Sequence, residues 1–186
     1  MKKLICLVFL IIVMIMEFSC NNPKRSQKND NFEKGSFGYD LAYLSQKDDG
    51  LIVLSGNDDK AQIIVSAKYQ GKVFTSTANG LSGNSLGFVN YKVFDADVID
   101  EHMNGYGGEN RFWLGPEGGK YSVYFAPDAR QVFDNWHTPK PIDVEQWDVV
   151  SSDVDNVVMK KYIQVTNYLG SHLKLNVDRK IYYARS

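Results

Sequence analysis

Cysteine is nearly absent from this chain of 186 residues, and histidine is rare. The two cysteines are Cys6 and Cys20, and Cys6 lies within an apolar run near the amino terminus. A chain cleaved before Cys20 would keep a single thiol at its first position. The sequence therefore excludes an intrachain disulfide framework for the mature protein.

The three histidines, His102, His137 and His172, are far apart and have no cysteine nearby. We therefore expect neither a metal site nor a cofactor. The glycines around residue 107 follow no predicted strand and open no predicted helix, which excludes a nucleotide-binding loop. The sequence does not exclude a Ser-His-Asp triad, although the chain has no Gly-x-Ser-x-Gly turn.

The chain also lacks an excess of basic residues. It has 21 Lys and Arg residues and 22 Asp and Glu residues, which gives a net charge of −1. The basic residues gather in no patch, so the sequence predicts no nucleic-acid partner. Aromatic residues, in contrast, make up 13% of the chain. Together with many Val and Ile residues, they favour strands over helices.

The amino terminus is typical of an export signal. Lys2 and Lys3 precede an unbroken apolar run over residues 4–16, which suits a signal-peptide core and is too short to span a bilayer comfortably. Ser19-Cys20 follows that run and resembles a bacterial lipobox, in which the Cys receives a lipid. The alternative is an ordinary secretory signal with an incidental Cys.

The lipobox resemblance implies a division of the chain into three parts. Residues 1–19 would be a lipoprotein signal peptide, and Cys20 would carry the lipid. The polar residues 20–36 would be a flexible tether, followed by a folded domain over 37–186. We therefore expect an exported protein of the cell envelope that a lipid anchors to a membrane, the bacterial outer membrane in particular.

Short β-like runs separated by turn residues make up the expected domain. Residues 51–54 precede a strong turn, and residues 61–69 and 72–78 flank Gln70-Gly71 as a hairpin. Residues 86–94 and 121–125 are further strand candidates, whereas helical character is confined to a turn or two near residues 39–44.

The last third of the chain has the clearest pattern. Residues 172–183 alternate strictly between apolar and polar positions, with Arg179 as the exception on the apolar face. Such a period of two predicts a half-buried antiparallel strand, which we pair with residues 157–166 through a turn at 167–171. The fold class is therefore all-β, as an antiparallel β-sandwich.

Residues 102–119 concentrate glycines, aromatic rings and charges. Trp113 offers a flat apolar face with one polar edge, and Arg111 and Glu117 offer charge-assisted hydrogen bonds, which together suit a sugar ring. The alternative is an irregular connection whose glycines make turns and in which Arg111 pairs with Glu117.

A second cluster surrounds His137, which follows Trp136 and precedes two prolines. The imidazole could act as a general acid or could bind a hydroxyl group. The alternative is a loop held by its prolines, in which Trp136 seals the edge of the core.

The stretch Gly107-Gly108-Glu109-Asn110-Arg111-Phe112-Trp113-Leu114-Gly115-Pro116-Glu117-Gly118 resembles a segment of galactose-mutarotase-like (aldose-epimerase-like) proteins. It is most similar to a branch of exported lipoproteins of unknown function. Four further stretches agree in order with that branch, namely residues 37–41, 69–77, 136–139 and 165–168.

This resemblance implies a partial β-supersandwich of the galactose-mutarotase type, in which the chain corresponds to the amino-terminal half. The family's acid His and base Glu would come after Ser186, so no catalytic residue is carried over. Arg111, Trp113, Glu117 and His137 remain as expected carbohydrate contacts.

Two functions follow from the resemblance. One is a membrane-tethered lipoprotein with a carbohydrate-binding β-sandwich that is not catalytic alone. The alternative is an epimerase or mutarotase that acts on a sugar anomeric centre. A half-sandwich also exposes a strand edge, so we expect residues 172–183 to be an edge that pairs with another chain or self-associates.

Overall fold

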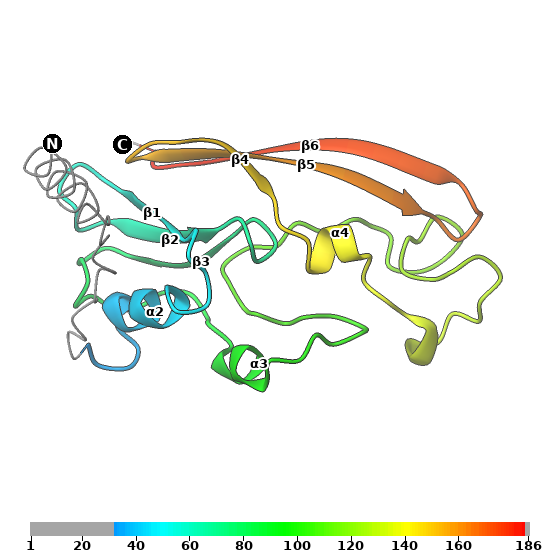
Figure 1. The fold of residues 1–186 in the computed structure, drawn as a ribbon, viewed down its shortest axis with the longest axis horizontal. Helices are drawn as coiled ribbons and strands as arrows, with labels where there is room; N and C mark the ends of the chain where they lie inside the picture. Colours follow the sequence, from blue (N-terminus) through cyan, green and yellow to red (C-terminus); the bar gives the residue numbers. More distant parts are fainter. Residues whose placement is uncertain (1–31, 185–186) are drawn as a thin grey trace, which may run out of the picture. The chain divides into compact units, whose positions relative to one another are not determined.

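The computed structural model describes residues 32–184 (Figure 1). The predicted signal peptide and Cys20 lie outside these residues. Within the described part, the helices and strands in chain order are α2 (Phe37–Leu44), β1 (Ile52–Ser55), β2 (Gln62–Ser66), β3 (Lys72–Thr77), α3 (Tyr91–Ala96), η1 (Phe133–Asn135), α4 (Lys140–Asp143), β4 (Asp148–Ser152), β5 (Asn156–Thr166) and β6 (His172–Tyr182).

The first sheet has the antiparallel order β1-β2-β3. The connection between β2 and β3 spans residues 67–71 and ends with Gln70 and Gly71, whose φ angles are 64° and 55°. The predicted hairpin is confirmed, although β2 ends at Ser66, three residues before the predicted end of that strand at Tyr69. Helix α2 begins after Ser36, whose hydroxyl oxygen accepts a hydrogen bond from the backbone N–H of Tyr39 at 3.3 Å.

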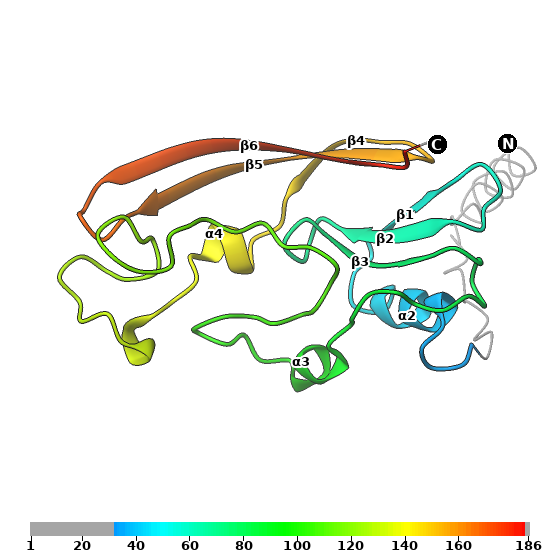
Figure 2. The same ribbon diagram turned by 180° about the vertical axis from the view of Figure 1, so that it is seen from behind.

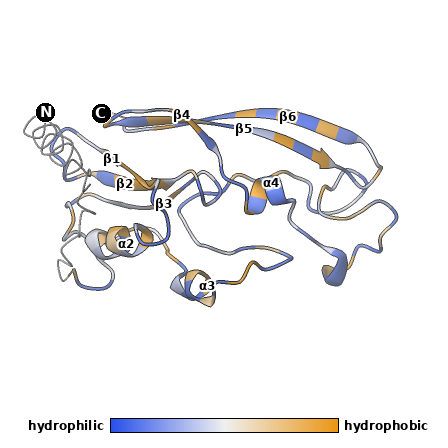
Figure 3. Ribbon diagram, viewed as in Figure 1, coloured by the Kyte–Doolittle hydropathy of each residue, from blue (hydrophilic) through white to orange (hydrophobic). Residues whose placement is uncertain are grey.

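The second sheet has the antiparallel order β4-β5-β6. Strands β5 and β6 are 11 residues each and lie side by side, as the two opposite views in Figure 1 and Figure 2 show. Alternating positions of β5 are buried, and the matching positions of β6 are half-buried. Figure 3 shows this alternation as bands of hydrophobic and hydrophilic residues along both strands. The predicted hairpin is therefore confirmed.

Side chains from both sheets meet in one apolar cluster. It contains Leu54, Val65 and Val73 from the first sheet, Val157 and Met159 from the second, and the buried Trp147. The opposite face of the first sheet packs on a second cluster, which includes Phe74 and residues of α2 and α3. Because adjacent strand residues point to opposite faces, Val73 and Phe74 enter different clusters. The regular structure is mostly antiparallel strand with few short helices, which confirms the all-β class.

Two predicted strands are wrong. Residues 86–94 form a single bridge, from Val89 to Gly107, and then enter helix α3. The helix directs Phe94 into the second cluster, where its ring lies 5.0 Å from that of Tyr69. Burial of this aromatic side chain is worth about 1.5–3 kcal/mol, which outweighs the weak strand preference of the segment.

Residues 121–125 also form no strand. The carbonyl of Ser122 accepts a hydrogen bond from Tyr168, whereas that of Tyr124 accepts one from His137. Two different segments therefore satisfy this backbone, so no continuous ladder forms.

The end of the expected tether is part of the fold. Ser36 bridges to Asn84, and the ring of Phe32 lies close against Gly38. Among the described residues, no helix is long and apolar enough to cross a membrane.

Candidate functional site

The glycine-rich segment lies against strand β3 and the residues around Phe88. Gly107 and Gly108 have φ angles of 89° and 105°. A Cβ atom on Gly107 would be 2.2 Å from the carbonyl oxygen of Phe88, and one on Gly108 would be 2.9 Å from that of Val73. These glycines therefore permit close backbone packing, which sets the position of the residues that follow.

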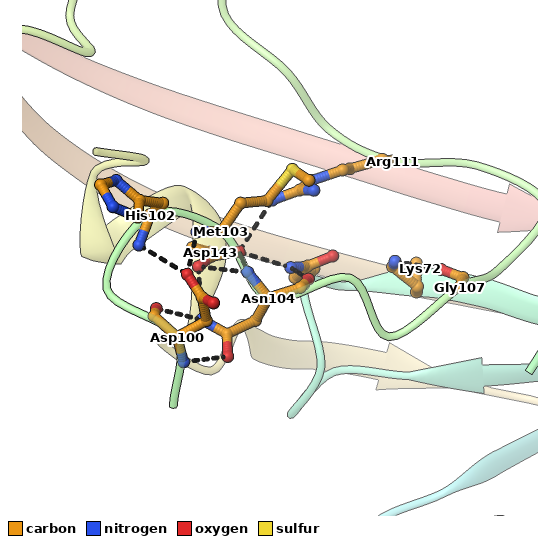
Figure 4. A network of polar contacts seen from close by, with 9 residues as sticks. Lys72, Asp100, His102, Met103, Asn104, Gly107, Arg111 and Asp143 are labelled. Atoms are coloured by element: carbon orange, nitrogen blue, oxygen red, sulfur yellow. Dashed lines mark hydrogen bonds and ion pairs between the residues drawn. The ribbon is translucent and has the colours of Figure 1, made fainter. Parts of the chain in front are cut away.

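Asp143, at the end of α4, is the hub of a buried polar network (Figure 4). Its carboxylate accepts hydrogen bonds from Arg111 Nη2 at 2.7 Å and from Gln70 Nε2 at 2.8 Å. It also accepts bonds from the backbone and side-chain nitrogens of Asn104, at 3.0 and 2.7 Å. One carboxylate thus joins the turn between β2 and β3, the glycine-rich segment and α4.

Positive charge exceeds negative charge around this hub. Lys72 is buried and donates a hydrogen bond to the carbonyl of Gly107. Burial, and the nearby charge of Arg111, lower the pKa of Lys72 to about 8. Burial also lowers the pKa of Arg111, against the opposing effect of Asp143. Both cations are therefore held at an electrostatic cost that Asp143 partly offsets.

Arg111 leads from this network to Trp113 and Glu117. Its guanidinium carbon lies 4.3 Å from the centre of the Trp113 ring, a cation–π contact. The indole Nε1 donates a hydrogen bond to Glu117 Oε1 at 2.9 Å. Three of the four predicted sugar contacts therefore lie together, and Arg111 pairs with Asp143 instead of Glu117.

A row of stacked rings continues from Trp113. Tyr124 stacks on Trp113 with a centroid distance of 5.0 Å and on Trp136 at 5.3 Å. Beyond Trp136 lies the exposed ring of Phe133, which contacts His102 at 4.6 Å. Such offset and parallel contacts hold flat surfaces in defined positions.

His137 lies at the end of this row. Its ring stacks on that of His102 at 4.9 Å, and its Nδ1 lies 3.0 Å from the carbonyl oxygen of Glu101. A carbonyl accepts and cannot donate, so Nδ1 carries the proton. The Nε2 atom of neutral His137 is then an acceptor.

His137 also lines a cavity of about 550 Å³. That volume is within the range of small-molecule sites, roughly 300–1,000 Å³. The cavity lies between the loop segments and strand β5, and the lining residues with polar side chains are Glu101, Tyr124, His137, Thr138, Lys140, Gln164 and Thr166. The hydroxyl oxygen of Thr138 is buried and has no partner among the described residues.

Arg111, Trp113 and Glu117 do not line this cavity. The predicted residues thus form a cluster of three and a separate His137, and Tyr124 connects them because it both stacks on Trp113 and lines the cavity.

Several residues of the site were not predicted from the sequence. Asp143 and Gln70 are distant from Arg111 along the chain, and Gln70 was recognised only as part of a turn. The sequence offered one signal for a buried carboxylate. Asp143 directly follows the apolar Ile142, in a segment whose backbone is restricted by prolines. In the described part of the chain, no group of His, Cys, Asp and Glu could hold a metal ion.

Comparison with known proteins identifies a family. Residues 35–185 match a family described as a family of unknown function (DUF6786). No curated protein and no solved structure matches the chain. The match covers both sheets and the whole candidate site, so the chain belongs to this family of unknown function, DUF6786.

Proposed function

We propose that this protein is a membrane-tethered lipoprotein whose folded domain binds carbohydrate and does not act as a catalyst alone. The observation that carries this proposal is the row of rings between Trp113 and His137, with a cavity at one end. Exposed aromatic faces pack against the C–H faces of sugar rings, and polar groups at their margins bind hydroxyls. In this row Phe133 and His137 are exposed, whereas Tyr124 is buried and supports the rings on either side of it.

The polar groups match this ligand class. Among the groups that line the cavity, the carboxylate of Glu101 and the Nε2 atom of His137 are acceptors, whereas the side-chain nitrogens of Lys140 and Gln164 are donors. Sugar hydroxyls both donate and accept, so a mixed set suits them better than a set of one kind. Rings already stacked on one another lose little conformational entropy when a ligand binds.

Binding is favoured over catalysis by the state of the carboxylates. Asp143 is occupied by its network, and Glu117 accepts from Trp113. The Glu101 side chain is 80% exposed, where water strongly solvates its charge. A general base is usually held in a buried position, whereas Glu101 projects into water with only the His102 Nε2 atom nearby, 3.7 Å from its Oε1.

The shared apolar cluster supports a finer proposal for the fold. Because residues of both sheets pack together, we place the domain among β-sandwiches, as part of a supersandwich of the galactose-mutarotase type. The resemblance around Arg111 and Trp113 supports the same placement. The lipobox-like Ser19-Cys20 supports a lipid anchor in the cell envelope.

A glycan array probed with the full chain in detergent tests this proposal. We expect binding to a defined sugar class, with a loss of roughly ten-fold or more in affinity for His137→Ala and for Gln164→Ala. Gln46→Ala is the matched control, because Gln46 is exposed just after α2 and does not line the cavity. Equal binding by all three variants would refute the site.

One observation favours a second candidate, a mutarotase-like enzyme. His137 and Glu101 line the same cavity, which provides an imidazole and a carboxylate for acid–base chemistry. Polarimetry on a fresh α-anomer distinguishes the two functions. Mutarotation above the buffer rate that is lost in both His137→Ala and Glu101→Gln would establish the enzyme, whereas binding without rate enhancement supports the first proposal.

A further inference from the structure

Strand β6 is a long, regular edge of its sheet. Its pairing with β5 continues from His172 to Tyr182 without a register shift. No backbone hydrogen bond joins its outer side to another segment within residues 32–184. It therefore presents a row of unpaired N–H and C=O groups, which is a template for another strand.

The opposite edge of the same sheet is built differently. Strand β4 has five residues, and its pairing with β5 shifts register between Val149 and Ser151. Short length and a bulge are two common devices that protect a sheet edge from pairing. Strand β6 has neither device, and it contains no proline.

We propose that β6 pairs with β6 of a second copy of this chain, antiparallel and about a two-fold axis at Asn176. The two sheets then form one continuous sheet in the order β4-β5-β6-β6-β5-β4. In this register, Leu175 lies opposite Val177 of the second copy on the half-buried face, which extends the apolar surface of both copies.

Charges on the exposed face select this register. Lys174 lies opposite Asp178 of the second copy, and the symmetry produces this pair twice. Asp178 already lies 3.6 Å from Lys160 on β5, so each Asp178 is placed between two lysines. Shifting the axis by one residue loses this pair in either direction. An axis at Val177 puts Lys174 opposite Lys180, where like charges are unfavourable, and an axis at Leu175 puts Lys174 opposite the neutral Asn176.

Cysteine cross-linking of the full chain in its membranes tests the register. In Asn176→Cys the two introduced thiols lie directly opposite, with Cβ atoms about 5 Å apart, so mild oxidation is expected to yield a disulfide-linked dimer. In Asp178→Cys they lie four residues apart along the strand, about 13 Å, so no such dimer is expected. Cys6 and Cys20 are treated alike in both variants, so the difference between them reports on β6 alone.

Two charge variants test the interaction itself. Lys174→Asp puts two acids opposite each other, and Asp178→Lys puts two lysines opposite each other. Each variant alone is expected to self-associate about ten-fold more weakly than the unchanged chain, and a mixture of the two should associate as well as the unchanged chain.

Three results would overturn the proposal. One is equal cross-linking of the Asn176→Cys and Asp178→Cys chains, or none in either. Another is a mixture of charge variants that associates no better than each variant alone. The third is cross-linking of Asn176→Cys to a different protein or to another segment of the same chain.

Discussion

Arg111 and Asp143, which are 32 residues apart in the sequence, form an ion pair of 2.7 Å, and the Asp143 side chain is only 5% exposed. The same carboxylate also binds Gln70 and Asn104. The position of Arg111 over Trp113 therefore depends on a residue that contacts neither the ring nor the cavity. Asp143 positions the candidate site and does not form part of its surface.

The first prediction concerns this carboxylate. Asp143→Asn leaves Arg111 without a counter-charge and adds to the positive charge around Lys72. We expect a loss of about 2–4 kcal/mol in the free energy of unfolding, because removing one partner of a largely buried ion pair strands the other. Urea unfolding monitored by tryptophan fluorescence measures this change.

Asp95→Asn is the matched control for that experiment. Asp95 also pairs with a cation, Lys47, at 3.3 Å, but its side chain is 61% exposed. Exposed pairs contribute little, so a change within about 0.5 kcal/mol is expected. A similar loss in both variants would contradict a special role for Asp143.

The second prediction concerns the pH dependence of stability through Lys72. Its pKa is lowered by burial to about 8 in the folded protein, against 10.5 ordinarily. Between these values the unfolded chain binds more protons than the folded one, so this group makes stability rise with pH. We expect a gain of about 1 kcal/mol between pH 7.5 and 9.0, a window that stays below the ordinary tyrosine pKa of about 10.

Lys72→Met should remove most of that rise. Lys160→Met is the control, because the Lys160 side chain is 58% exposed and the rise should survive its loss. Unfolding curves at four pH values would measure the slope for each chain. An unchanged slope in the Lys72→Met chain would show that another group is responsible.

The third prediction concerns the turn between β2 and β3. Gly71 has a φ angle of 55°, and a Cβ atom there would lie 2.8 Å from carbon atoms of the buried Trp147 ring. We expect Gly71→Ala to lower the free energy of unfolding by about 2–3 kcal/mol through strain and crowding. Gly105→Ala meets no atom within 4 Å and should cost less than about 0.5 kcal/mol. Thermal unfolding of the two chains separates these effects.

The fourth prediction concerns the lipid anchor. Cys20→Ser should abolish labelling by a fatty-acid probe and release the protein from the membrane fraction, because a serine hydroxyl replaces the thiol that accepts the lipid. Cys6→Ser, within the apolar run, should leave labelling unchanged. Persistent labelling of the Cys20→Ser chain would mean that the cysteine is incidental.

Local patterns predicted much of the fold. The alternation in residues 172–183 predicted β6, and Gln70-Gly71 predicted the turn between β2 and β3. These features depend on neighbouring residues, so the sequence displays them directly. The strand predicted for residues 86–94 was wrong because Phe94 packs in a cluster with aromatic rings that are distant in the sequence. No local pattern reveals such packing.

The site was predictable in its residue types more than in its geometry. The concentration of glycine, aromatic and charged residues around Arg111 predicted that Trp113 and Glu117 belong to the same site, and these residues do lie together. Their link to Asp143 depends on the tertiary structure, because the glycine-rich segment and α4 meet only when α4 packs beside the turn between β2 and β3. The stacking of His137 on His102 depends on long-range packing for the same reason.

The unequal edges of the second sheet limit how large an assembly can grow. A strand pair about a two-fold axis uses the same surface on both copies, so it closes after two copies. The remaining outer edges are then both β4, whose short length and register shift discourage further addition. Pairing through β6 therefore yields a finite pair of domains and protects the protein from the open-ended sheet growth that leads to fibrils.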